Sequence, residues 1–91
     1  MFTHPDEAGF HGMTVVVEMN GQRIYVGRCS RFQTKEMVLV HCESHQPAEG
    51  VPDRASYIEK ARTMGHWPKI DKILLPRTEI RSVTLLRDYE V

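Results

Sequence analysis

The sequence has no excess of charge of either sign, few cysteines and no long hydrophobic run. Its 91 residues carry 12 basic and 12 acidic side chains, so the formal net charge is zero. A zero net charge excludes a global basic field, and any nucleic-acid contact must then come from a local patch. Because there is also no apolar signal segment, we expect a cytoplasmic protein without a membrane partner.

Cysteine is scarce as well, with only Cys29 and Cys42 present. In a reducing compartment both are expected to be small, buried, hydrophobic side chains, and a disulfide between neighbouring strands is the alternative. A chain of this length builds one small core and no deep cleft of its own. We expect a flexible N-terminal arm at residues 1–12 and a single folded domain at residues 13–91.

Short, β-branched segments make up most of that domain. The composition predicts five strands, at Thr14–Met19, Gln22–Cys29, Met37–Glu43, Ile70–Leu75 and Glu79–Arg87. Asn20-Gly21 predicts a hairpin turn after the first strand, and Ser30–Glu36 predicts a polar turn after the second. Residues 52–65 predict a short helix that ends at Gly65.

Five short strands in so small a domain are most economically arranged as a closed barrel, because closure removes exposed sheet edges. Gly27 lies in the middle of the second strand, and because glycine has no side chain, the strand can bend sharply there. We therefore predict a mainly β fold: a small, five-stranded, strongly bent barrel of SH3 type, with one short helix between the third and fourth strands.

The spacing of apolar residues resembles the Sm-like (LSm) superfamily, as a divergent bacterial or phage-type member. The positions similar to its first motif are Val17, Met19, Tyr25, Gly27, Cys29, Phe32-Gln33 and Met37-Val38-Leu39-Val40. Those similar to its second motif are Ile73-Leu74-Leu75-Pro76-Arg77, Ile80 and Val83. The two motifs cover about half of the chain and rest on hydrophobic spacing and one glycine.

The resemblance implies a homo-oligomeric ring in which the fourth strand of one subunit pairs with the fifth strand of the next. It also implies weak binding of single-stranded RNA around the turn after the second strand, at Arg31, Phe32, Gln33, Lys35 and Arg77. Copies of these basic residues would repeat around the ring. No cofactor and no enzymatic activity are expected.

The sequence differs from the family at the positions with which the family binds an RNA base. Gln33 stands in place of the family's aspartate, and Met37 in place of its asparagine. Pro76-Arg77 replaces an arginine-glycine turn. Gln33 can still bond a base edge and Arg77 can still stack on a base or meet a phosphate, but the family's base specificity is not expected here.

Two other functions remain open from the sequence. One is a structural or protein-interaction ring with no nucleic-acid role. The other is a metal-binding protein that uses His41, Cys42 and His45, since imidazole and thiolate bind zinc and copper. Alternation along a strand separates His41 from Cys42, so such a site would need a further ligand from His66 or from a neighbouring subunit. A nucleophilic cysteine would need a lowered thiol pKa beside a base.

Overall fold

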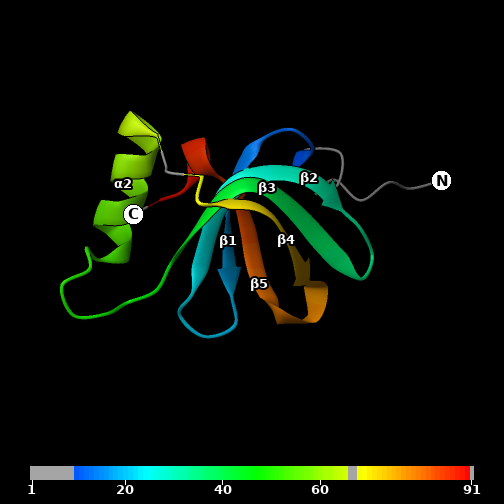
Figure 1. Cartoon of the computed structure of the whole chain (residues 1–91), viewed down its shortest axis with the longest axis horizontal. Helices are drawn as coiled ribbons and strands as arrows, with labels where there is room; N and C mark the ends of the chain where they lie inside the picture. The colour runs from blue at the N-terminus through cyan, green and yellow to red at the C-terminus, as the bar shows by residue number, and fades with distance from the viewer. Residues whose placement is uncertain (1–9, 66–67, 91) are drawn as a thin grey trace.

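Five antiparallel strands form one sheet, and the computed structural model describes residues 10–65 and 68–90 of the chain. The strands are β1 (Thr14–Met19), β2 (Ile24–Phe32), β3 (Glu36–His45), β4 (Ile70–Pro76) and β5 (Ile80–Leu85). Helix α2 (Arg54–Met64) lies between β3 and β4, and the short 3-10 helices η1 (Arg77–Glu79) and η2 (Leu86–Asp88) follow β4 and β5 (Figure 1). The predicted mainly β class and the helix after the third strand are confirmed.

The strands lie in the order β4-β3-β2-β1-β5 across the sheet. Within the described ranges, β4 pairs only with β3 and β5 pairs only with β1. The sheet is therefore open in a single chain, with β4 and β5 as its two edges.

Irregular pairing bends this sheet. The register shifts between Val26 and Arg28 and again between Cys29 and Arg31 where β2 pairs with β3, and once more in the pairing of β1 with β5. Each shift inserts an unmatched residue that bends its strand and increases the local twist. The curvature of β2 and β3 over the other strands is visible in Figure 1.

Gly27 lies opposite the first of these bulges, and no larger residue fits there. A Cβ added to Gly27 would lie 2.3 Å from the Cβ of Cys42 and 2.9 Å from its Cα. On the facing strand the bulged residue His41 adopts a positive φ of 50°. Close approach of the two backbones thus requires glycine on β2 and a left-handed residue on β3.

The sheet buries side chains on both faces. One face contributes the larger cluster, formed by Val15, Val17, Met19, Cys29, Phe32, Met37, Leu39, Cys42 and Leu75. On the other face Val16, Ile24 and Val26 pack against Ile58 of α2. Three consecutive valines in β1 are fully buried because both sides of that strand are covered.

The helix ends where the sequence chemistry predicts. The side chain of Asp53 caps its start by accepting a hydrogen bond of 2.8 Å from the Ser56 backbone N–H. At the other end Gly65 has a φ of 87°, and its N–H donates to the Ala61 carbonyl. Ile58 and Ala61 are its buried residues.

The predicted polar turn at residues 30–36 is too long. Strand β2 continues through Phe32, whose ring is buried in the larger cluster, and Phe32 pairs with Met37 of β3. Burial of this aromatic side chain extends the ladder by three residues beyond Cys29, so the connecting turn is confined to residues 33–35.

Residues 1–9 of the expected arm lie outside the described part, whereas residues 10–12 contact the sheet. The Gly12 N–H donates to the Cys29 carbonyl at 2.7 Å, and the Phe10 ring lies 6.1 Å from the Phe32 ring between centroids. None of the helices in the described ranges has the length and hydrophobicity needed to cross a bilayer.

Candidate nucleic-acid interface

Arg77 links two turns that are far apart in the sequence. It follows β4, and the pairing of Glu36 with Pro76 brings it beside the turn between β2 and β3. Its backbone N–H donates to the Lys35 carbonyl at 2.9 Å, and its Nη1 donates to the Gln33 carbonyl at 2.9 Å. The guanidinium carbon lies 4.1 Å from the centroid of the Phe32 ring, which is a cation–π contact.

Four of the five residues predicted to contact RNA therefore lie together: Phe32, Gln33, Lys35 and Arg77. Gln33 and Lys35 are exposed and line an open hollow of about 630 Å³. The Glu36 carboxylate borders the same hollow and offsets part of its positive charge. Arg31 is exposed but precedes Phe32 in an extended strand, so its side chain leaves the opposite face of the sheet.

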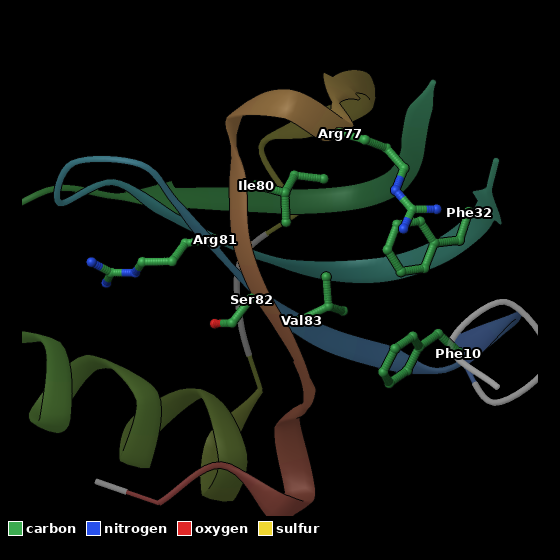
Figure 2. Close-up of a pocket in the computed structure, with 7 residues that line it drawn as sticks. All are labelled: Phe10, Phe32, Arg77, Ile80, Arg81, Ser82 and Val83. Atoms are coloured by element: carbon green, nitrogen blue, oxygen red, sulfur yellow. The ribbon is translucent and has the colours of Figure 1, made fainter. Parts of the chain in front are cut away.

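A second hollow, of about 260 Å³, lies beside the Arg77–Phe32 pair. It is lined by Phe10, Phe32, Arg77, Ile80, Arg81, Ser82 and Val83. In Figure 2 the Arg77 guanidinium lies over the Phe32 ring, whereas Arg81 and Ser82 point away from that ring. The sequence gives no signal for Phe10, because the segment before β1 has no periodicity.

Met37 lies in the core rather than at the interface. Its side chain is fully buried in the larger cluster. It therefore has no surface on which a base could contact it, and the loss of base specificity stays a prediction.

The residues considered as metal ligands are not brought together. Cys42 is buried in the larger cluster, whereas His41 is exposed. His45 is 6% exposed; its ring stacks on Tyr57 of α2, and its Nε2 lies 2.7 Å from the Pro52 carbonyl oxygen, to which it donates. No three His, Cys, Asp or Glu side chains among residues 10–65 and 68–90 are grouped to hold a metal ion. His66 lies outside these ranges.

Both cysteines are free, buried thiols, as the sequence predicts. Burial raises the pKa of the Cys29 thiol to about 11. Burial also raises the pKa of the Cys42 thiol. These shifts favour the neutral thiol, which is the opposite of what a nucleophilic cysteine requires.

No protein-family model matches the sequence, and no curated protein matches it. Among solved structures, the chain is similar to a chain of the one described as the crystal structure of the NatC complex bound to CoA. The two superpose with a TM-score of 0.57 at 16% sequence identity, and the match covers 86% of this chain and 80% of that chain. At this identity the likeness shows a shared fold and nothing about activity.

Proposed function

We propose that this protein is a non-catalytic, cytoplasmic assembly subunit whose copies join into a homo-oligomeric ring of Sm-like type. The observation that carries the proposal is the position of β4 and β5 at the two edges of an open, bent sheet. These are the two strands whose pairing between subunits the Sm-like resemblance implies. Strand pairing from subunit to subunit would join the bent sheets of neighbouring copies edge to edge around the ring.

The side chains of these edges support the same interpretation. Leu74 on β4 is 49% exposed, so a strand added along this edge would remove part of its apolar side chain from water. Ile80 on β5 is half-buried and lines the hollow beside Phe32. An open edge also presents unpaired backbone N–H and C=O groups, which a strand from another copy would satisfy. Because the two edges differ, their pairing is heterologous and closes as a ring when the rotation permits.

Replacing Leu74 with lysine is expected to weaken this assembly by about tenfold or more, because the ammonium group would be desolvated against a neighbouring strand. The measurement is mass by light scattering over a dilution series of the parent and of L74K. Met64→Lys is the matched control, since Met64 is 76% exposed on α2, away from both edges. A parent protein that is monomeric throughout, or an L74K variant that dissociates no more readily than M64K, would contradict the proposal.

Contact with single-stranded RNA is a second function that the geometry favours. The observation is the stacking of Arg77 on Phe32, with the guanidinium held further by the Gln33 carbonyl. A guanidinium plane fixed on an aromatic ring is a surface on which a base can stack. In a ring the same surface would recur once per subunit, so that weak contacts add. A ring that serves only protein interaction is the alternative.

Arg77→Gln is expected to lower the affinity for a labelled single-stranded RNA about tenfold, since it removes both the stacked cation and its charge. Fluorescence anisotropy at low salt measures this change. Arg23→Gln is the control, because Arg23 is exposed near the far end of β2 and bonds to Ser44 and Gln46. If the parent assembles but has no RNA affinity at low salt, the protein-interaction ring is the correct function.

A further inference from the structure

A row of polar and basic side chains crosses the sheet at the end where β1 begins. Thr14 of β1 pairs with Arg28 of β2, and Arg28 pairs with Val40, the residue before His41 on β3. In the other direction Val15 pairs with Leu85 of β5, and Arg87 lies two residues further on. The row spans three interstrand spacings of about 4.8 Å, or about 14 Å in total.

Two adjoining hollows follow this row. The first, of about 170 Å³, is lined by Thr14, Arg28, His41 and Pro68. The second, of about 350 Å³, is lined by Gly12, Met13, Thr14, Arg62, Leu85, Leu86 and Arg87. Thr14 lines both hollows, and no carboxylate is among the residues that line them.

Arg62 has a structural task in this region. Its guanidinium donates to the backbone carbonyls of Leu86 and Tyr89 and to the Glu59 carboxylate, and thereby ties α2 to the segment after β5. By contrast, the side chain of Arg87 is 71% exposed. The cationic groups that can meet a ligand along the row are therefore those of Arg28 and Arg87.

The residue at the β3 bulge is a second observation at this row. Among the non-glycine residues of the described ranges, only His41 has a positive φ. It occupies the bulge of β3 opposite Gly27. Glycine would adopt this conformation without steric cost, yet the position carries an exposed imidazole beside Arg28. The bulge fixes this backbone conformation, and residues held in it are concentrated at binding and active sites.

We propose that the Thr14–Arg28–His41–Arg87 row is a phosphate-binding site that follows the backbone of a single-stranded RNA. Arg28 binds one phosphate through its guanidinium fork, and the His41 ring N–H and the Thr14 hydroxyl donate to the same group. Arg87 meets a neighbouring phosphate. Inorganic phosphate shares this chemistry. That the bound phosphate belongs to RNA rests on the RNA contact proposed above. Binding of inorganic phosphate does not depend on that contact.

The site is distinct from the Arg77–Phe32 pair. Phe32 packs in the larger cluster on one face of β2, whereas Arg28 follows Ile24 and Val26 at two-residue spacing and so belongs to the face that α2 partly covers. An RNA strand held at both places would pass from one face of the sheet to the other. The phosphate row would then contribute affinity without base selectivity.

Two nearby carboxylates oppose a phosphate here. Asp88 lies 3.8 Å from the Arg87 guanidinium. Asp71 lies on β4 between Ile70 and Lys72, which pair with Cys42 and Val40 on either side of His41. Removing the charge of Asp71 should therefore strengthen phosphate binding about threefold in D71N.

The test is a titration of labelled single-stranded RNA at several salt concentrations, with a parallel titration of inorganic phosphate followed by amide chemical shifts. Arg28→Gln should weaken RNA binding about fivefold and reduce the slope of log K against log salt by about 0.7, the value for one phosphate contact on a single strand. Arg23→Gln, also an exposed arginine of the β1–β2 hairpin, should change neither quantity.

His41→Gly separates a binding role from a structural one. Glycine accepts a φ of 50° without strain, so H41G should keep or raise the midpoint of thermal unfolding while it weakens RNA or phosphate binding about threefold.

The two titrations together identify the ligand. If the variants lose affinity for both RNA and phosphate, the site binds phosphate in general. If they lose affinity for RNA alone, the site binds the polynucleotide backbone. If R28Q and H41G bind both ligands as the parent does, or the parent binds neither, the inference is wrong. If only R77Q loses RNA affinity, the RNA contact at Phe32 is supported and the phosphate site proposed here is wrong.

Discussion

Gly27→Ala is expected to lower the free energy of unfolding by about 3 kcal/mol or more, or to prevent folding altogether. The new Cβ would lie 2.3 Å from the Cβ of Cys42 and 2.9 Å from its Cα, and these are the backbone and first side-chain atoms of a central strand. They cannot rotate away as the end of a long side chain would. The β2–β3 ladder would have to separate at its bulge, with loss of packing on both sides.

Gly50→Ala is the matched control for this substitution. Gly50 has a φ of 80° and open space where a Cβ would be placed. Alanine there is strained only by the backbone conformation, and a cost of about 1 kcal/mol is expected. Urea unfolding of the parent, G27A and G50A measures the difference. Equal costs for the two variants would show that β2 and β3 do not approach as closely as the structure places them.

The elements with strong local signals could be predicted from the sequence. The β-branched run of β1 and the helix end at Gly65 are local features, and the structure confirms both within one or two residues. The end of β2 could not be placed in this way. Ser30 and Arg31 are polar, and only the burial of Phe32 in a core built from distant strands shows that they belong to the ladder.

Most of the first candidate site could be predicted from the sequence, whereas the second could not. The resemblance to Sm-like proteins predicts that Arg31, Phe32, Gln33, Lys35 and Arg77 lie together, and all of them except Arg31 do meet. The row through Arg28 and His41 has no such signal in the sequence. It depends on the register between strands and on a bulge that leaves His41 and Arg28 lining one hollow, and both are set by long-range pairing.

The two proposed binding surfaces depend on different parts of the fold. The Arg77–Phe32 pair is held by the turn after β2 and by η1, beside the β4 and β5 edges that would form the ring. The phosphate row lies near the start of β1, where Arg62 of α2 ties the helix to the segment after β5. Correct docking of α2 is therefore a condition for the second surface and not for the first.

Ile58→Ala tests that docking and is expected to lower the free energy of unfolding by about 3 kcal/mol. Ile58 is fully buried, and it packs on Val16, Ile24 and Val26 of the sheet. The truncation would leave a cavity between helix and sheet that the fixed strands cannot close. Urea unfolding gives the stability, and hydrogen exchange of the α2 amides shows whether the helix separates from the sheet before the strands unfold.

Met64→Ala is the control on the same helix, because the Met64 side chain is 76% exposed and should change stability by no more than about 0.5 kcal/mol. The I58A variant should also lose part of its phosphate affinity while it keeps the Arg77-dependent RNA contact, since only the phosphate row adjoins α2. If I58A is as stable as M64A, the helix is not held by this side chain. The contacts of Arg62 with Leu86 and of Tyr57 with Glu43 would then be the ones that fix α2 against the sheet.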